Sequence, residues 1–225
     1  MRHADFCTQF LTPNASVLDI GSGKGIFLVE MAQKGFHVSG VETSVEYIAE
    51  TKEKARQANV TVEVIQAHAE KLPFADHMFE FANCSEVSEH VDDPVALVRE
   101  IFRVLKPGGK AYISFHNRFG IFDYHYHLYF INWMPRRMAE WVLHLCGKQK
   151  VDSPSIGRQK LSTMHYFSYR KAVSLLEQVG FSVEDIRVDR IHRRFRYTSF
   201  VPLVCYRLLL RPLYFNTFHL VARKP

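Results

Sequence analysis

An apolar run that ends in a glycine-rich loop and continues as a helix is the feature that most constrains this chain. The stretch VLDIGSGKGIF covers residues 17–27 and places glycines at positions 21, 23 and 25. Glycines at a strand-to-helix turn let backbone N–H groups approach a ligand closely. The loop has isoleucine where a dinucleotide fingerprint has its third glycine, and it lacks the Gly-Lys-Ser/Thr of a P-loop. It therefore suits neither a pyrophosphate nor a triphosphate well.

Strand-like and helix-like segments alternate as far as residue 117. Strands are expected at 16–21, 37–42, 60–67, 79–85 and 110–117, and helices at 25–35, 44–59 and 93–109. Ser44 stands at an expected helix N-cap and Pro94 at a first helical position. Together with two later strands, this alternation predicts an α/β fold with a doubly wound, mostly parallel seven-stranded sheet.

The alternation breaks after residue 117. An aromatic-rich insertion is expected over 118–165, helical around 135–146. A helix at 168–181 and strands at 182–190 and 217–225 follow it. We predict a single domain over 1–225, with a ligand-binding core at 15–117, the insertion as a lid or substrate region, and C-terminal helices and last strands at 166–225.

Two acidic residues narrow down the ligand. Asp19 precedes the glycines, where a carboxylate disfavours phosphate but favours an ammonium group. Glu42 ends the second expected strand, where an acid can accept both ribose hydroxyls. A nucleoside with an amino-acid tail and no phosphate describes S-adenosylmethionine (SAM). The plainer alternatives are that Asp19 only orients the loop and that Glu42 is a solvated strand end.

Five ordered motifs resemble the class I SAM-dependent methyltransferases, in the subgroup that includes the quinone-biosynthesis methyltransferases. They are VLDIGSGKG, GVETS, AHAEKLPFADHMFE, CSEVSEHVDDP and RVLKPGGKAYIS, which span roughly residues 15–117. The resemblance implies a Rossmann-like methyltransferase fold, SAM as cofactor bound by the 15–117 core, and methyl transfer as the activity.

The resemblance also implies roles for individual residues. The expected cofactor-binding residues are Asp19, Gly21, Ser22, Gly23 and Gly25 at the loop and methionine tail, Glu42 and Thr43 at the ribose, His68 and Ala69 at the adenine, and Asn83, Cys84 and Ser85 near the methyl group. His68 stands where the family usually has aspartate, and a neutral imidazole can still accept the adenine amino hydrogen through one nitrogen.

Histidines are the candidate catalytic bases near neutral pH. A base is needed only if the acceptor arrives protonated, because methyl transfer is otherwise an in-line displacement that depends on positioning. We single out His90, which follows the fourth expected strand, and His116, which ends the fifth. His90 could instead begin a turn and bond only to backbone. His125 and His127 would share one side of an extended segment, but no third ligand is evident, so no metal site is predicted.

Charge is unevenly distributed along the chain. Residues 1–117 carry a net −5 and residues 118–225 a net +11. A basic, aromatic-rich half suggests a partner that is anionic and partly apolar, or simply solvated arginines and lysines. We expect a small hydrophobic or lipid-linked acceptor, such as a quinone precursor or a glycan intermediate. Segment 200–215 could lie on a membrane surface with Arg207 and Arg211 at the headgroups, or pack on the sheet edge.

Two other functions stay open. The basic run RIHRRFRY at 190–197 suggests a nucleic-acid methyltransferase, although Asn-Cys-Ser-Glu from position 83 is not the motif used on base amines. A non-catalytic SAM-binding protein is the other, although the glycine loop and Glu42 are intact. Scattered cysteines and an N-terminus without an apolar core predict a cytoplasmic protein, or one at the membrane surface, that is a monomer or loose dimer.

Overall fold

The computed structural model describes residues 2–148, 160–195 and 200–225. Its strands are β1 (Ser16–Ile20), β2 (His37–Glu42), β3 (Glu63–Gln66), β4 (Phe79–Cys84), β5 (Leu105–His116), β6 (Phe122–Asp123), β7 (Leu128–Tyr129), β8 (Ser182–Asp185) and β9 (Thr217–Arg223). Its helices are α1 (His3–Cys7), α2 (Ile26–Gln33), α3 (Val45–Gln57), α4 (Pro94–Val104), α5 (Arg136–Leu145), α6 (Tyr169–Val179), α7 (Ile186–Arg194) and α8 (Phe200–Cys205). Short 3₁₀ turns lie at Thr8–Phe10 and Ile131–Trp133, and a π-helical segment at Tyr206–Tyr214.

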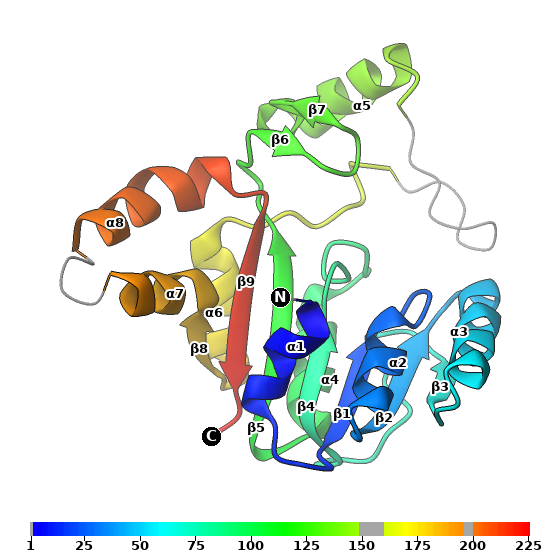
Figure 1. Ribbon diagram of the computed structural model, residues 1–225. Helices are drawn as coiled ribbons and strands as arrows, with labels where there is room; N and C mark the ends of the chain where they lie inside the picture. The colour runs from blue at the N-terminus through cyan, green and yellow to red at the C-terminus, as the bar shows by residue number, and fades with distance from the viewer. Residues whose placement is uncertain (1, 149–159, 196–199) are drawn as a thin grey trace.

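Seven strands form one sheet in the order β3-β2-β1-β4-β5-β9-β8 (Figure 1). The five strands from β3 to β5 pair in parallel, whereas β9 runs antiparallel to both β5 and β8. This confirms the doubly wound, mostly parallel α/β sheet. Parallel strands joined through helices place all their carboxyl ends at one edge, and the chain reverses direction of winding between β1 and β4.

Helices cover both faces of the sheet. On one face, α4 and α6 bury a cluster that includes Leu97, Ile101 and Leu176. On the other face, α1, α2 and α7 pack over a second cluster that includes Leu28 and Phe81. Burial on both faces explains why the parallel strands read as continuous apolar runs rather than as alternating ones.

Local sequence signals account for the main helix starts. The Ser44 hydroxyl accepts a hydrogen bond from the backbone N–H of Tyr47 at the start of α3. Asp93 caps α4 through the N–H groups of Val95 and Ala96, and Pro94 is the first residue of that helix. These caps confirm the helix starts expected from the sequence.

The insertion has a small core of its own. It contains the β6–β7 hairpin and α5, which Figure 1 shows beyond the carboxyl end of β5. Its apolar side chains pack on one another, and they are Tyr126, Ile131, Ala139, Leu143, Leu161 and Met164. Helix α5 lies within the predicted 135–146 helix, while the hairpin was not expected.

Two predicted elements differ from the structure. The strand expected at 182–190 ends at Asp185, because that side chain accepts a hydrogen bond from the N–H of Arg187 and starts α7. The helix expected at 93–109 ends at Val104, and β5 begins there with an irregularity in its pairing to β4 between Phe79 and Phe81.

Candidate active site

A pocket of about 560 Å³ lies at the carboxyl ends of β1, β2, β3 and β4. Ligands of open α/β sheets bind at this edge, next to the point where the winding reverses. The residues that line it are Gly21, Val41, Glu42, Thr43, Tyr47, Ala67, His68, Ala69, Glu70, Glu86, Val87, His90, Val91 and Asp92. Five predicted cofactor-binding residues are among them, namely Gly21, Glu42, Thr43, His68 and Ala69.

The glycine loop forms one wall of the pocket. Gly21 has φ +65°, and a Cβ atom there would overlap the side chain of Val87. Gly25 has φ +72° just before α2, and a Cβ atom would overlap Thr51. Only glycine can adopt this backbone conformation and also lie so close to the neighbouring Val87 or Thr51 side chain. The side chain of Ser22 is buried next to the loop.

Glu42 is held rigidly by backbone donors. Its Oε2 accepts a hydrogen bond from the N–H of Gly23 at 2.7 Å. Its Oε1 accepts from the N–H groups of Thr43 at 2.8 Å and Ser44 at 2.9 Å. The Thr43 hydroxyl also donates to Oε1 at 3.2 Å, so Oε1 accepts three hydrogen bonds and Oε2 only one. These bonds fix the direction of the carboxylate, and Oε2 keeps acceptor capacity for a ligand.

Asp19 is buried beneath the loop with Asn83 beside it. The Asn83 amide donates to Asp19 Oδ1 at 2.7 Å, and the ring nitrogen Nε2 of His3 lies 2.8 Å from Asn83 Oδ1. Burial raises the pKa of Asp19 to about 7, with a smaller contribution from the negative charge of Glu42 and an opposing one from the Asn83 hydrogen bond. The site therefore contains a carboxyl group that is only partly ionised at neutral pH, and an approaching cation would favour its ionised form.

Other predicted cofactor residues lie behind the pocket wall. Cys84 is fully buried in the apolar core between the strands and α4, and burial raises the pKa of its thiol. Ser85 is half-buried after β4. Neither residue lines the pocket, and the same holds for Asp19, Ser22, Gly23, Gly25 and Asn83.

Two glutamates and three histidines meet where β4 and β5 end. His116 Nδ1 lies 3.0 Å from Glu89 Oε1, and its Nε2 lies 3.7 Å from Glu86 Oε2. Glu89 Oε1 is also 3.8 Å from Nε2 of His125 and 3.6 Å from Nε2 of His90. The two predicted catalytic histidines, His90 and His116, are thus brought to one carboxylate, and His90 also lines the pocket.

Charge and burial act in opposite directions on this cluster. Burial alone would raise the pKa of Glu89, but the adjacent His116 and His90 outweigh it and hold the pKa at about 2. Burial alone would lower the pKa of His116, but the Glu89 carboxylate outweighs it and raises the pKa. The pair therefore favours an ionised Glu89 beside a positive charge.

Sequence reasoning overlooked part of this cluster. The expectation that His125 has no further ligand-type partners is wrong, because Glu86, Glu89 and His116 lie around it. His127 is not in that group. The signal available in the sequence was the Glu-Val-Ser-Glu spacing directly after a buried strand, which places both carboxyl groups at the ligand-binding edge. His3 and Tyr47 were also overlooked.

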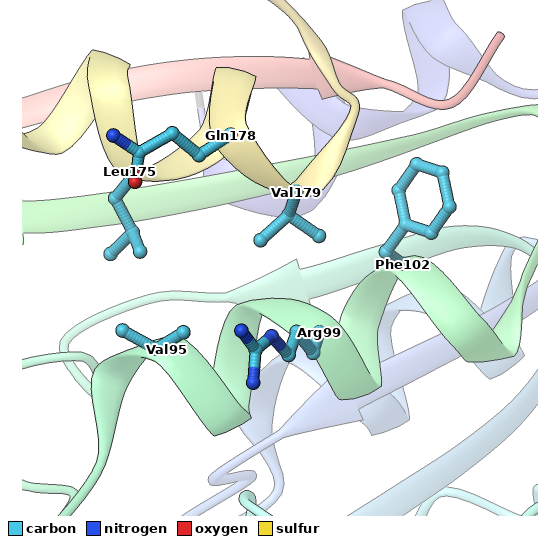
Figure 2. A pocket seen from close by; sticks show the side chains of 6 residues that line it. All are labelled: Val95, Arg99, Phe102, Leu175, Gln178 and Val179. Atoms are coloured by element: carbon cyan, nitrogen blue, oxygen red, sulfur yellow. The ribbon is translucent and has the colours of Figure 1, made fainter.

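A smaller hollow of about 300 Å³ lies elsewhere, between α4 and α6. Figure 2 shows its side chains, Val95, Arg99 and Phe102 from α4 and Leu175, Gln178 and Val179 from α6. It is a groove between two helices on one face of the sheet, away from the strand ends where the glycine loop and the acidic residues gather.

Comparison with known proteins gives one family. Residues 18–113 match the methyltransferase domain family. The ubiquinone biosynthesis O-methyltransferase of Pseudomonas fluorescens (strain Pf0-1) is 39% identical over 105 residues, which are 45% of this chain and 44% of that protein. The chain thus spans less than half the length of the curated relatives it matches.

Solved structures share the fold over nearly the whole chain. A SAM-dependent methyltransferase from Methanosarcina mazei has a TM-score of 0.64 at 23% identity, covering 97% of this chain and 96% of the other. Phosphoethanolamine N-methyltransferase 2 of Haemonchus contortus, solved with SAM, has a TM-score of 0.63 at 18% identity, covering 98% of this chain and 51% of that one. At these identities the likeness concerns the fold alone.

Proposed function

Since the chain carries a class I SAM-dependent methyltransferase domain, we propose that it transfers a methyl group from SAM to a small hydrophobic or lipid-linked acceptor. The observation that carries the proposal is the pocket at the strand ends, where Glu42 is fixed by three backbone donors and Asp19 lies buried under the glycine loop. This arrangement suits a ligand with a ribose and an ammonium group and no phosphate.

Each part of SAM has a matching group. Glu42 and Thr43 would bind the ribose hydroxyls, and Asp19, from behind the pocket wall, would attract the ammonium group of the methionine tail electrostatically. His68 and the backbone of Ala69 would contact the adenine at the end of β3, where both residues line the pocket. Gly21 lies so close to Val87 that a larger residue there would have to displace this part of the pocket wall.

SAM supplies an electrophilic methyl group, so the protein has mainly to position the acceptor and exclude water. The methyl group would lie toward β4 and β5, where His90 and Glu86 line the pocket. An acceptor that arrives as a hydroxyl must lose its proton, and His90 or His116 is placed to help with this step. O-, C- and N-methylation are all compatible with these residues.

The hydrophobic acceptor is inferred from exposed apolar side chains close to the strand ends. On the insertion Tyr129 and Trp133 are exposed, and on α5 so are Met138 and Trp141. Helix α8 and the π-helical segment after it expose Phe200, Val201, Leu208, Leu209 and Tyr214.

Within the described ranges, no helix has the length and apolarity that crossing a bilayer requires. Amphipathic helices with exposed apolar faces are typical of binding at a membrane surface.

One detail of the membrane hypothesis needs correction. Arg207 is exposed on the π-helical segment, as a headgroup contact requires. Arg211 is not, because its guanidinium stacks on the Tyr169 ring at 3.6 Å and lies 3.8 Å from the Asp185 carboxylate. Arg211 therefore anchors the segment to the sheet edge.

The experiment that tests the proposal uses SAM with a radiolabelled methyl group. The purified protein is incubated with an extract of the source cells, which is then divided into organic, aqueous and nucleic-acid fractions. We expect label in the organic fraction with the unchanged protein and none with the Glu42→Gln variant. The matched control is Glu63→Gln, which changes an exposed glutamate on β3 and should retain the label. Label found only in the nucleic-acid fraction would support the alternative that the acceptor is a nucleic acid. The absence of label from every fraction would contradict the proposed methyltransferase activity.

The basic run that suggested nucleic acid lies far from this pocket. Its residues 190–194 belong to α7, which packs on β8 and β9 at the opposite edge of the sheet from β3. Residues 196 and 197 of the run are outside the described residues. The pocket residues come from the end of β2, the start of α3 and the loops after β1 to β4, so α7 does not contribute to them.

A further inference from the structure

We propose that a cavity between α1 and α7 binds an oxyanion, a carboxylate or phosphate group, and that this group is part of the methyl acceptor. The cavity has a volume of about 260 Å³ and lies over β5 and β9, on the face of the sheet that carries α1 and α7 (Figure 1). Its lining residues are Arg2, His3, Phe6, Tyr112, Ile186, Arg187, Arg190 and His219. The assignment to the acceptor rests on the proposed function, whereas the oxyanion site does not.

This α1–α7 cavity has a positively charged lining. Three guanidinium groups and two imidazoles border it, and its described lining residues include no aspartate or glutamate. Arg2 is paired with Glu30 at 3.2 Å, but within the described ranges neither Arg187 nor Arg190 forms an ion pair with a carboxylate. Two such guanidinium groups beside one cavity create a positive potential that a bound oxyanion would neutralise.

Arg187 is fixed by contacts that leave donors available. Its Nη1 donates to the carbonyl of Thr217 at 2.6 Å, and its guanidinium lies 3.9 Å from the centre of the Phe215 ring. A guanidinium has five N–H donors, so others remain for a ligand. Asp185 offsets part of the charge of Arg187, but this carboxylate also accepts a hydrogen bond from the Tyr206 hydroxyl at 2.8 Å. Because the guanidinium is already ordered, little conformational entropy is lost when it binds an anion.

His219 reports the positive surroundings of the cavity. Burial lowers the pKa of this imidazole to about 3, and the positive charges of Arg187, of Arg190 and of protonated His3 act in the same direction. His219 is therefore neutral near pH 7, and its Nδ1 lies 2.5 Å from the Tyr112 hydroxyl. When that hydroxyl donates to Nδ1, the ring carries its proton on Nε2, which is then a further hydrogen-bond donor.

The size and the aromatic walls of the cavity suit one group of an organic ligand. Pockets that hold a whole small-molecule ligand measure about 300–1,000 Å³, and this cavity is slightly smaller. The Arg190 guanidinium lies 5.1 Å from the centre of the Phe6 ring, and the His3 and Tyr112 ring centres are 4.5 Å apart. Ring faces beside guanidinium groups favour an acidic group carried on an apolar or aromatic stem over a hydrated inorganic ion.

The cavity is connected to the cofactor-binding residues through β4. His3 lines the cavity, and its Nε2 lies 2.8 Å from Oδ1 of Asn83. Asn83 donates to Asp19 at 2.7 Å and is the direct partner on β4 of Tyr112 on β5. Since Asn83 is expected near the methyl group, an acceptor held by its acidic group in the cavity would extend toward that end of β4.

The first test measures oxyanion binding without SAM, so its outcome does not depend on methyl transfer. Phenyl phosphate, benzoate and the uncharged benzamide are titrated into the full chain, and binding is followed by ligand-observed NMR. We expect both anions to bind at least about tenfold more tightly than benzamide. Arg187→Gln and Arg190→Gln should each weaken anion binding at least about tenfold, because each removes a charge-assisted hydrogen bond.

Two variants guard this test against unfolding and against non-specific attraction. Arg187→Gln also loses the Thr217 contact, so the exposed Arg190→Gln, checked by a melting curve, is the decisive variant. Arg170→Gln changes an exposed arginine on α6, on the opposite face of the sheet, and should bind both anions as the unchanged protein does. Anion binding that is absent, or equal in the unchanged protein and the folded Arg190→Gln variant, would overturn the site.

The second test identifies the source of the oxyanion. The labelled organic fraction from the methyl-transfer assay is passed over an anion-exchange resin at pH 8. We expect the resin to retain the labelled product, and Arg190→Gln to give at least about tenfold less of it. Label only in products that the resin does not retain would show that the oxyanion is a separate ion, and would overturn its assignment to the acceptor.

The two tests also separate this proposal from the proposed function. Anion binding without methyl transfer to any fraction would support the oxyanion site, but it would overturn both the proposed function and the assignment of the oxyanion to a methyl acceptor. Methyl transfer to an uncharged product by a protein that binds neither anion would leave the proposed function intact and overturn the site.

Discussion

Single buried carboxyl groups determine much of what this site can bind. Asp19 is 3% exposed and has Asn83 as its neighbour, so its negative charge is poorly solvated until a cation arrives. Glu42 is only 7% exposed, but three backbone N–H groups already stabilise its charge. The two acids therefore respond differently to pH, and Asp19 is the one whose ionisation should be linked to ligand binding.

Binding of S-adenosylhomocysteine should strengthen as pH rises from 5.5 to 7. Burial raises the pKa of Asp19 to about 7, so the free protein holds a neutral acid at the lower pH, whereas the ligand's ammonium group favours the ionised form. Affinity should rise roughly tenfold over this range, with release of a proton on binding. Calorimetry in two buffers of different ionisation enthalpy measures both quantities. Asp19→Asn should give a flat profile, and an equally steep profile in that variant would exclude Asp19 as the cause.

Gly21→Ala should destabilise the protein more than Gly23→Ala. Both residues have positive φ, +65° and +50°, so each alanine costs about 1–2 kcal/mol of backbone strain. At Gly23 the added Cβ meets nothing within 4 Å, but at Gly21 it overlaps Val87. Chemical denaturation without ligand measures the difference in the free energy of unfolding. Adding Val87→Ala should restore part of the loss at Gly21, and no restoration would contradict the steric explanation.

The sequence led to pocket-lining residues where local spacing alone fixes their position. The glycine loop and Glu42 could be found because spacing along one strand and one turn fixes them. Glu89, His125 and Tyr166 could not be connected from the sequence, because their meeting depends on how the insertion folds back over β4 and β5. No local pattern reports a contact of that kind.

At the scale of elements, the apolar segment 200–215 has both buried and exposed residues, which the sequence pattern alone did not distinguish. Its apolar residues predicted either a membrane surface or core packing, and in the structure some of these residues are buried while others are exposed. Tyr206 is buried, with its hydroxyl donating to Asp185 at 2.8 Å, whereas Phe200 is 77% and Leu208 68% exposed. The strand expected at 182–190 was wrong for a related reason, since Asp185 is needed both as a helix cap and as a partner for Tyr206.

The exposed face of this segment should bind vesicles of anionic phospholipid. Leu208 and Leu209 are 68% and 60% exposed, next to the exposed Arg207. Burying a leucine side chain is worth about 1.5–3 kcal/mol, so the double change Leu208→Ser and Leu209→Ser should lower the vesicle partition coefficient at least about tenfold. Co-sedimentation with vesicles measures it. Met78→Ser, which changes a 43% exposed residue at the opposite end of the sheet, is the control and should have no effect.

For the whole molecule, the order of strands and helices could be predicted because each element carries its own periodicity and caps. The reversal of winding between β1 and β4 is part of the doubly wound strand order, and ligands bind next to such a reversal, so the pocket's location was predictable as well. The fold of the insertion was not, because it depends on a separate small core around Tyr126 and Leu143 rather than on the sheet. The molecule thus combines a core whose elements follow from local sequence patterns with an insertion whose packing depends on contacts between distant residues.

This division predicts that the insertion can be removed without losing the cofactor site. Its two ends meet, since the N–H of Phe167 donates to the carbonyl of His116 at 2.7 Å and the N–H of Arg118 to the carbonyl of Phe167 at 2.8 Å. Replacing residues 119–165 with a short glycine-serine linker should therefore leave the fold closed. All pocket-lining residues lie between Gly21 and Asp92, so the dissociation constant for S-adenosylhomocysteine should stay within about fivefold, because one lost side-chain contact is worth about 1 kcal/mol.

Methyl transfer, in contrast, should be lost in the same variant, because water enters the site and the acceptor loses its lid. Calorimetry and the radiolabel assay, run on one preparation with a melting curve as folding control, separate the two effects. A folded variant that no longer binds S-adenosylhomocysteine would show that the insertion completes the cofactor pocket. A variant that still methylates the organic fraction would show that the acceptor is bound by β4, β5 and the 200–215 segment alone.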